Sequence, residues 1–335
     1  MFKSLRILKY FFLFFFLLLV IVITLSQIHI PKRNELKYGV TFSQKQAMAL
    51  GLDWKKTYIA MLDELGVKKL RLSAYWDDLQ SVEGGEYTWN DLDWQISEAS
   101  SRNAEIVLAM GGRLPRWPEC HYPEWVNNLD KDKKEKYTLD YLEKTILRYK
   151  ENKNITAWQV ENEPFLKYFG ICPPLDSNFL DKEIALVKKL DSRPVIVTDS
   201  GELSLWVPAA KRADIFGTTM YRDTYSAKLE RYVHYPITPA FFRFKKNVTS
   251  FFAKPQKWVV IEMQGEPWGP KPFQNLSEEE RSKTMNLQKF KDMIEFSSTT
   301  GFSEFYLWGV EWWYWEKEIQ NNPDIWEAAK ELYQK

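Results

Sequence analysis

The chain has 335 residues, 45% of them hydrophobic, and its formal net charge at pH 7 is +1. The hydrophobic content is enough for a sizeable core, while the balanced charge excludes the basic surface typical of a nucleic-acid-binding protein. The three His residues lack His-x-His and His-Glu-x-x-His spacing and the glycine pairs are isolated, so we expect no metal, no cofactor and no phosphate-binding loop.

The first thirty residues have the pattern of a membrane signal. Basic residues within the first nine positions precede an apolar run at 10–25, and a helix that crosses a bilayer needs about 20 residues. No small-residue cleavage site follows this run. The sequence predicts an uncleaved signal anchor at 1–30, with a transmembrane helix at about 10–28 and the rest of the chain outside the cytoplasm. A cleaved signal and a secreted protein are the alternative.

Short apolar runs alternate with longer amphipathic segments from residue 36 onward. The predicted strands are Tyr38–Phe42, Lys69–Ser73, Glu105–Met110, Thr156–Glu161, Val195–Thr198, Ile215–Met220, Trp258–Glu262 and Glu304–Trp308. The predicted helices are Trp54–Leu65, Asn90–Ser101, Lys136–Tyr149, Asn178–Leu190, Leu203–Arg212, Pro239–Phe252, Glu278–Ser297 and Pro323–Tyr333. Eight strand–helix repeats predict an α/β fold, a single (β/α)8 TIM barrel over 36–335 that follows the anchor helix.

Two of the predicted strands end on a carboxylate. Glu163 follows the fourth strand in the sequence Asn162-Glu163-Pro164, and Glu262 ends the seventh strand after Val-Val-Ile. We expect Pro164 to hold Glu163 extended at the strand tip. Each carboxylate alone fits an ordinary strand-end salt bridge. Because parallel barrel strands open onto one face, the pair instead predicts the two carboxyl groups that cleave a glycosidic bond.

These motifs resemble the retaining glycoside hydrolases of clan A, the (β/α)8 "4/7" superfamily that includes family 5 and cellulase-like barrels. The resemblance covers about residues 36–335 and implies double displacement on an extracellular or cell-surface oligo- or polysaccharide. It implies that Glu163 is the acid/base and Glu262 the nucleophile. It also implies substrate-binding or supporting roles for Arg71, Asn162, Tyr221 and Trp308.

One feature departs from this pattern. Some families of the clan carry a His in the loop after strand three and another near strand six, but neither His121 nor His234 aligns securely with those positions. The particular family therefore stays open.

Further acidic and aromatic residues follow the predicted strand tips. Glu202 and Glu266 either bind sugar hydroxyls or form loop salt bridges, and Trp117 and Trp268 are candidate platforms for sugar rings. The aromatic run at 312–315 either builds a binding wall or packs the last helix onto the barrel.

Two further buried features are predicted. Glu161 lies one pleat inward from Glu163 and is expected to be a buried structural carboxylate. Cys120 and Cys172 follow strand-like runs in adjacent loops, and an exported chain can pair them in a disulfide; two free, partly buried thiols are the alternative.

The function predicted from these residues is a monomeric retaining glycosidase. A transglycosylase acting on a surface glycan and a non-catalytic glycan-binding barrel are the alternatives. The first shares the chemistry of the first half-reaction, and the second would leave the two carboxylates without a catalytic role.

Overall fold

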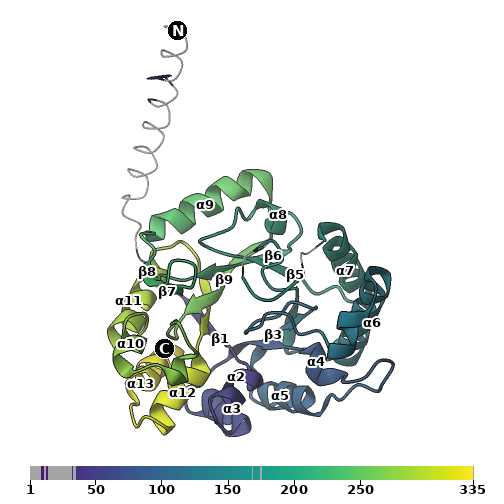
Figure 1. Ribbon diagram of the computed structural model, residues 1–335, viewed down its shortest axis with the longest axis horizontal. Coiled ribbons are helices and arrows are strands. Elements are labelled where there is room, and N and C mark those ends of the chain that lie inside the picture. Colours follow the sequence, from purple (N-terminus) through teal and green to yellow (C-terminus); the bar gives the residue numbers. More distant parts are fainter. Residues whose placement is uncertain are drawn as a thin grey trace.

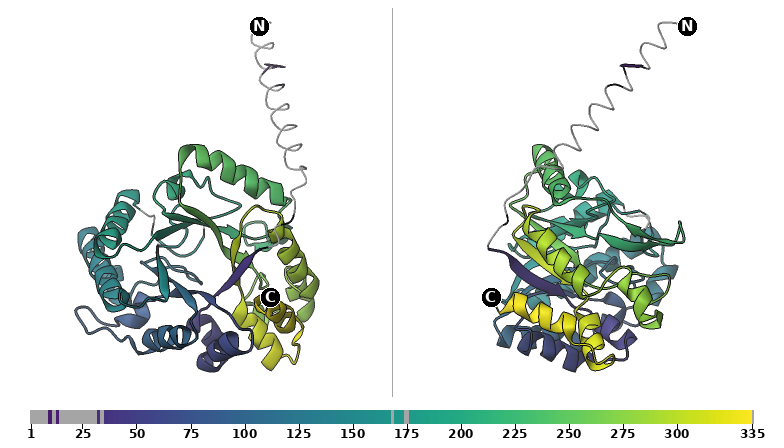
Figure 2. Two further views of the ribbon diagram at one scale, coloured as in Figure 1. Left: turned by 180° about the vertical axis from the view of Figure 1, so that it is seen from behind. Right: turned by 90° about the vertical axis from the view of Figure 1, so that its left-hand side faces the viewer.

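The computed structural model describes residues 9, 10, 13, 32, 35–167, 169–173 and 176–334. Within this part of the chain, eight parallel strands close into a barrel in the order β1-β10-β9-β6-β5-β4-β3-β2, and helices surround it (Figure 1). The predicted (β/α)8 barrel is confirmed. Seen from the side, the helices run along the outside of the barrel (Figure 2).

The barrel strands lie where the sequence places them, and their ends differ from the predicted ends by no more than two residues. They are β1 (Lys37–Thr41), β2 (Lys69–Ser73), β3 (Glu105–Met110), β4 (Ile155–Val160), β5 (Val195–Asp199), β6 (Ile215–Met220), β9 (Lys257–Gln264) and β10 (Glu304–Trp308). A hairpin that the sequence analysis did not predict, β7 (Asp223–Ser226) with β8 (Arg231–His234), follows β6.

The helices agree with the prediction less closely, because three short ones were not foreseen and one predicted helix is divided. They are α2 (Gln44–Ala49), α3 (Trp54–Asp63), α4 (Trp76–Leu79), α5 (Asn90–Ser101), α6 (Lys131–Tyr149), α7 (Ser177–Leu190), α8 (Val207–Ala210), α9 (Pro239–Phe252), α10 (Glu278–Ser282), α11 (Leu287–Ser298), α12 (Val310–Glu318) and α13 (Asp324–Tyr333). Two 3-10 turns, η1 (Glu124–Asn128) and η2 (Phe273–Asn275), complete the set.

The predicted helix at 278–297 is two helices, and capping residues explain the division. Ser277 and Glu280 form a reciprocal capping box that begins α10. Asn286 begins α11, where its side chain accepts a hydrogen bond from the backbone N–H of Lys289. An N-cap in the middle of an amphipathic run starts a new helix, so the continuous helix was wrong.

The aromatic run at 312–315 belongs to α12 and packs against the barrel. Trp312, Trp313 and Trp315 are buried, and the Trp313 indole Nε1 donates to the carbonyl oxygen of Gly265 at 2.7 Å. Of the two readings of this run, packing is therefore the one that the structure supports.

The side chains inside the barrel change from apolar to polar along the barrel axis. Its lower part is an apolar cluster of inward-facing side chains, namely Val107, Ala157, Ile196, Val259, Ile261 and Tyr306. Above it, at the ends of the strands, buried polar side chains replace the apolar ones, among them Arg71, Gln159 and Thr198. This polar layer marks the end of the barrel at which active sites of this fold lie.

The predicted transmembrane helix at about 10–28 lies, apart from two isolated positions, outside the described residues. Within the part of the chain that the structure does describe, no helix combines the length and the apolar character that crossing a membrane requires.

Candidate active site

Arg71 on β2 lies fully buried in the middle of the barrel mouth. Its guanidinium donates from Nε to Gln159 Oε1 at 2.7 Å and from Nη1 to Glu262 Oε1 at 2.6 Å. A third hydrogen bond runs from Nη2 to Asn162 Oδ1 at 2.6 Å. Because the guanidinium is planar and its donors are fixed in direction, these three bonds set the relative positions of β2, β9 and the end of β4.

Glu262 points into the mouth because β9 contains a bulge. The β6 residues Thr218 and Thr219 pair with Val260 and Glu262, so Ile261 is an extra residue between them, and the register with β10 shifts over the same stretch. Regular alternation after inward-facing Val259 would have turned Glu262 away from the axis. The bulge instead redirects the side chain toward Arg71.

Both oxygens of Glu262 accept hydrogen bonds. Arg71 donates to Oε1, and the hydroxyl of Tyr221, which follows β6, donates to Oε2 at 3.1 Å. The residue is 4% exposed. A cation and a hydroxyl directed at a buried carboxylate stabilise negative charge on it.

Glu163 occupies the sharp turn after β4. Its φ is +43°, in the left-handed region, so the extended conformation expected before Pro164 was wrong. Tertiary hydrogen bonds decide the matter: Asn162 N–H donates to Arg113 O at 2.7 Å, and Glu163 N–H donates to Thr198 Oγ1 at 2.8 Å. A non-glycine residue held there costs about 1–3 kcal/mol, which is typical of functional turns.

The pKa of Glu163 is raised well above the usual carboxyl range. Burial is the largest cause, and the negative charges of Glu262 and Glu119 add to it. The residue is 5% exposed. The mouth therefore holds one carboxyl that accepts hydrogen bonds from a cation and a hydroxyl, and a second whose pKa is raised by burial and by negative neighbours.

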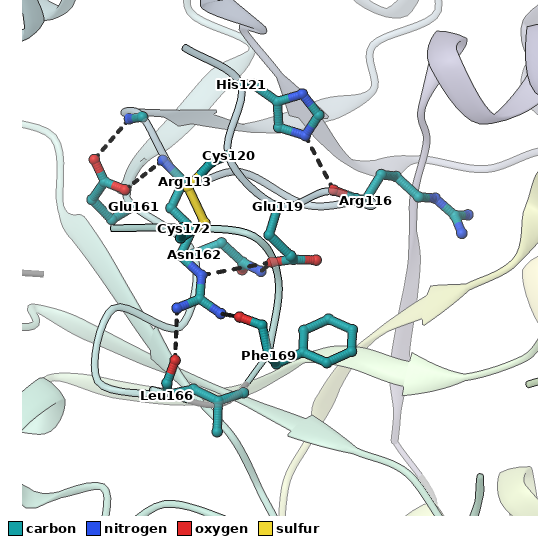
Figure 3. Close-up of a disulfide and its surroundings, with 11 residues drawn as sticks. Arg113, Arg116, Glu119, Cys120, His121, Glu161, Asn162, Leu166, Phe169 and Cys172 are labelled. Carbon is teal, nitrogen blue, oxygen red and sulfur yellow. Dashed lines mark hydrogen bonds and ion pairs between the residues drawn. A yellow bond between two sulfur atoms is a disulfide. The ribbon is translucent and has the colours of Figure 1, made fainter. Parts of the chain in front are cut away.

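Glu119, in the loop after β3, is a third buried carboxyl of this group. Its Oε2 accepts a hydrogen bond from Asn162 Nδ2 at 3.1 Å (Figure 3), and Arg113 Nε lies 3.8 Å from the same oxygen. Burial, followed by the charge of Glu262, raises the pKa of Glu119 to about 8. Sequence reasoning missed this residue, although its position directly before Cys120 was a usable signal.

The loops after β3 and β4 are joined to each other. Cys120 and Cys172 form a disulfide across them (Figure 3). The Arg113 guanidinium also crosses from one loop to the other and donates to the carbonyl oxygens of Leu166 at 2.7 Å and Phe169 at 2.8 Å. Glu119 and Glu163 therefore belong to two loops that are held together.

Glu161 is buried, and its carboxyl group accepts hydrogen bonds from the backbone. Its two oxygens accept from the N–H groups of Gly112 at 2.8 Å and Arg113 at 2.7 Å (Figure 3). Gly111 packs so closely that a Cβ there would lie 2.5 Å from Glu161 Oε1. The carboxyl thus fixes the start of the loop after β3, as a structural carboxylate would.

Trp308 at the end of β10 takes part in a buried ionic cluster. Its Nε1 donates to Glu266 Oε1 at 2.7 Å, and the Arg116 guanidinium lies over its ring, 4.1 Å from the centroid. Arg116 also donates to Glu266 Oε1 at 2.5 Å and to Glu311 Oε2 at 2.6 Å. Glu266 thus forms a buried salt bridge, one of its two predicted roles.

Glu202 holds the residue that contacts Glu262. It accepts hydrogen bonds from the backbone N–H of Tyr221 at 2.7 Å and from Thr219 Oγ1 at 3.2 Å. Burial raises the pKa of Glu202 to about 7. In this structure it positions Tyr221 and forms no loop salt bridge within the described residues.

The two tryptophans predicted as platforms lie at the rim. Trp117 is 64% exposed, and Trp268 is half-buried with its ring edge-on to Tyr221 at a centroid distance of 5.3 Å. Phe169 lies between them, 6.2 Å from Trp117 and 5.6 Å from Trp268. An aromatic row therefore leads from the surface to the residue that hydrogen-bonds Glu262.

The two histidines that follow strands three and six have partners other than Glu163 and Glu262. His121 is buried and its Nε2 is 3.1 Å from the Arg116 carbonyl oxygen, while His234 on β8 pairs with Asp223 at 3.0 Å. Among the residues that the structure describes, no group of three or more His, Cys, Asp or Glu side chains is arranged to hold a metal ion.

Comparison with known proteins places this site in a familiar fold. No family model matches the chain. The β-galactosidase BgaA of Clostridium cellulovorans is 27% identical over 173 residues, which are 46% of this chain and 26% of that protein. The chain thus spans about a quarter of this curated relative.

Solved structures of glycosidases match most of the chain. The exo-β-1,4-mannosidase Op5Man5 from Opitutaceae bacterium strain TAV5 has a TM-score of 0.59 at 12% identity, covering 92% of this chain and 61% of its own. A GH113 β-1,4-mannanase has a TM-score of 0.54 at 16% identity over 90% and 99%. A family 5 mannosidase from Rhizomucor miehei has a TM-score of 0.55 at 16% identity over 83% and 82%. The resemblance to the barrel glycoside hydrolases of clan A is confirmed in the fold.

Proposed function

We propose that this chain is a retaining β-glycosidase in which Glu262 is the nucleophile and Glu163 the acid/base. The observation that carries the proposal is the contrast between these two buried carboxyls. Arg71 and Tyr221 hydrogen-bond both oxygens of Glu262, whereas burial and negative neighbours raise the pKa of Glu163. Carboxyl groups with such opposed environments are the equipment of a two-step glycosidase.

The reaction proceeds by double displacement. Glu262 attacks the anomeric carbon as a carboxylate while Glu163 gives its proton to the departing oxygen, so the leaving group departs as a neutral alcohol. Water, deprotonated by Glu163, then attacks the same carbon from the opposite side to Glu262. The released sugar keeps its original configuration. This course requires carboxyl groups about 5–5.5 Å apart, against ~6.5–9.5 Å for an inverting enzyme.

The surrounding side chains keep these two groups in place. Arg71 fixes Glu262 relative to Asn162, and Tyr221, itself held by Glu202, supplies the second hydrogen bond to the nucleophile. When the glycosyl–enzyme bond forms, the Glu262 charge is lost and Glu163 becomes free to ionise. The proton affinity of the acid therefore falls at the step in which it has to act as a base.

The comparisons support a substrate class, and the disulfide supports a compartment. Three of the proteins named above are by description a β-galactosidase, an exo-β-1,4-mannosidase and a β-1,4-mannanase, which supports a β-linked oligo- or polysaccharide as substrate. The Cys120–Cys172 disulfide supports a compartment outside the cytoplasm, where such bonds persist. We place the enzyme there as a monomer, held at the membrane by the predicted segment at 1–30.

A trapping experiment tests the proposal. The protein is incubated with a panel of 2-deoxy-2-fluoro-β-glycosides of glucose, galactose, mannose and xylose that carry dinitrophenolate as leaving group. We expect one sugar to remain covalently attached and peptide mass mapping to place it on Glu262. Glu262→Gln serves as the matched control and should remain unlabelled. A label on another residue, or turnover of the parent glycosides by Glu262→Ala at the full rate, would refute the assignment.

A further inference from the structure

The loop after β3 reaches residues on the far side of the barrel mouth. In the closed strand order, β3 and β9 are four strands apart in either direction and thus face each other across the axis. Residues 113–120, called the strap here, leave β3 and return as a narrow turn: Arg113 and Cys120 form an antiparallel bridge, and Leu114 N–H donates to Glu119 O at 2.8 Å. Arg116 stands at its tip.

The tip of the strap is buried on the far side of the mouth. Arg116 contacts Glu266, which follows β9, Trp308 at the end of β10, and Glu311 at the start of α12. The side chains of Arg116 and Glu266 are 6% exposed and that of Glu311 is 0% exposed. A guanidinium held between two carboxylates and over an indole, away from water, is a fixed contact, since breaking it would leave charges buried without partners.

The base of the strap is held equally firmly. The disulfide ties Cys120 to Cys172, and Gly170 packs against the strap so closely that a Cβ there would lie 2.6 Å from the Cβ of Glu119. Figure 3 shows this base, with Glu119 directed at Asn162. The strap is therefore anchored at both ends, beside β4 and beside β9 and β10.

The positions of the acid and the nucleophile indicate which part of the substrate lies beside the strap tip. An acid gives its proton to the leaving oxygen, so the leaving group lies on the side of Glu163 at the end of β4. The sugar that is attacked lies toward Glu262 and Trp308, at the ends of β9 and β10. The strap tip lies on this second side, and its guanidinium occupies one face of the Trp308 ring. A second sugar that continued the chain in this direction would meet the buried cluster.

We propose that the strap makes the glycon side a closed pocket for one sugar ring, so that the enzyme removes single residues from the non-reducing end of β-linked oligosaccharides. This inference rests on the proposed function. A chain cleaved internally has to extend past the reacting ring on both sides, and here the side beyond Trp308 is filled by Arg116, Glu266 and Glu311.

Unpaired polar atoms at the closed end fit a terminal sugar. Arg116 Nε and Glu266 Oε2 are buried without a hydrogen-bond partner within the described residues. Buried polar atoms are nearly always satisfied, and a donor beside an acceptor suits hydroxyl groups, which both accept and donate. The free hydroxyls of a non-reducing terminal ring would supply hydrogen-bond partners for these two atoms. An internal ring carries a glycosidic oxygen in place of one such hydroxyl, and that oxygen cannot donate a hydrogen bond.

An aromatic row leads outward from the site and reaches the surface at Trp117 of the strap. The row formed by Trp117, Phe169 and Trp268 runs from the surface to Tyr221. Flat aromatic faces suit the apolar faces of pyranose rings. In the proposed arrangement the remainder of the oligosaccharide, which is the leaving group, passes Phe169, which lies in the loop after β4 that also carries Glu163.

Two matched substrates test the closed end. β-1,4-linked hexasaccharides of glucose, mannose and galactose are prepared in two forms, one with a cyclic ketal on the non-reducing terminal ring and one with a fluorescent label at the reducing end. We expect the labelled form of the accepted sugar to be shortened one residue at a time and the ketal form to remain intact. Cleavage of both forms at similar rates, or release of internal fragments, would overturn the pocket while leaving the glycosidase assignment standing.

A strap variant sharpens the test. Arg116→Ala removes the filling residue, and we expect the rate on the ketal form relative to the labelled form to rise roughly tenfold or more. Arg212→Ala removes a partly buried guanidinium paired with Asp181 and serves as the control with an unchanged ratio. If Arg116→Ala does not fold, the two hexasaccharides with the parent enzyme still decide the matter. An absence of both trapping and hydrolysis with every sugar tested would instead contradict the proposed function.

Discussion

The two ends of the barrel hold the same residue type in opposite electrostatic settings. At the N-terminal end, burial opposes ionisation of Glu304, but ion pairs with Lys257 at 2.8 Å and Lys69 at 3.7 Å lower its pKa overall. At the C-terminal end, burial and the charge of Glu262 raise the pKa values of Glu163 and Glu119. The pKa of Glu304 is lowered by its lysine partners, whereas those of Glu163 and Glu119 are raised by burial and by a negative neighbour.

Lowered and raised pKa values have opposite effects on how the stability of the fold depends on pH. A carboxyl with a lowered folded-state pKa stabilises the fold above its unfolded pKa of about 4.3, and this contribution is lost as the pH falls through the folded value. A carboxyl with a raised folded-state pKa contributes fully below about 4.3, and the contribution is lost as the pH rises through the folded value. The raised pKa values of Glu163 and Glu119 thus lower the stability near neutral pH, and in the proposed mechanism the proton kept on Glu163 is the one that is transferred.

The largest expected effect is at Glu262. Glu262→Ala removes the attacking group, and we expect kcat on an activated aryl glycoside to fall about 10⁴-fold or more. Steady-state kinetics measure the loss. Added azide should restore turnover and give a glycosyl azide of inverted anomeric configuration, because a small anion then attacks from the position of the missing carboxylate. A restored product with retained configuration would contradict the assigned role.

A smaller effect is expected at Glu163, and it depends on the leaving group. Glu163→Gln should lower kcat/KM by about 10²–10⁴-fold for alkyl or sugar leaving groups, which need a proton. For dinitrophenyl glycosides, whose leaving group needs none, glycosylation should change little. A series of aryl glycosides with graded leaving-group pKa values measures this, and equal losses along the whole series would argue against an acid.

The opposite end should respond in stability alone. Glu304→Gln breaks the pairs with Lys257 and Lys69, and we expect the free energy of unfolding at pH 7 to fall by about 1–3 kcal/mol. The difference from the parent should shrink as the pH falls through the lowered pKa of Glu304, where the parent's carboxylate also becomes neutral. Chemical denaturation at pH 7 and pH 3.5 measures it. A change in kcat would show that the two ends are not separate.

The smallest effect is expected behind the catalytic face. Glu183 on α7 is fully buried, and burial followed by the charge of Glu161 raises its pKa well above the usual range. Glu183→Gln introduces a side chain that stays neutral at every pH. We therefore expect the variant to unfold roughly 2–4 °C above the parent at pH 8, and at the same temperature as the parent at pH 4.5. Scanning calorimetry at both values measures this. An equal difference at the two pH values would exclude titration of this carboxyl as the cause.

The sequence was sufficient for the barrel and for the parts of the site that lie on strands. Strand-length apolar runs locate the eight strands, and residues at their ends, such as Arg71 and Tyr221, meet wherever parallel strands close into one barrel. Even there the orientation of Glu262 was hidden, because a one-residue bulge depends on the register of β6 and β10 rather than on the local pattern.

The loop residues could not be placed in the same way. Arg116 and Glu119 owe their positions to partners far away in the sequence, Glu266 and Glu311 for the first and Asn162 for the second. No short-range periodicity encodes such contacts. The left-handed turn at Glu163 was missed for a similar reason, since hydrogen bonds to other strands override the local preference before proline.

The disulfide has a mechanical consequence for the entrance. Together with β3, β4 and the two loops it closes a ring of chain around Glu119 and Glu163, so an insertion in either loop strains the other and the two walls change shape only as a unit. The strap tip has no covalent link and is held by the ion pairs and ring contact of Arg116 and by a hydrogen bond from the Tyr75 hydroxyl to the carbonyl oxygen of Pro115 at 3.0 Å. A covalent bond therefore fixes the base of the strap, and buried ionic and ring contacts fix its tip.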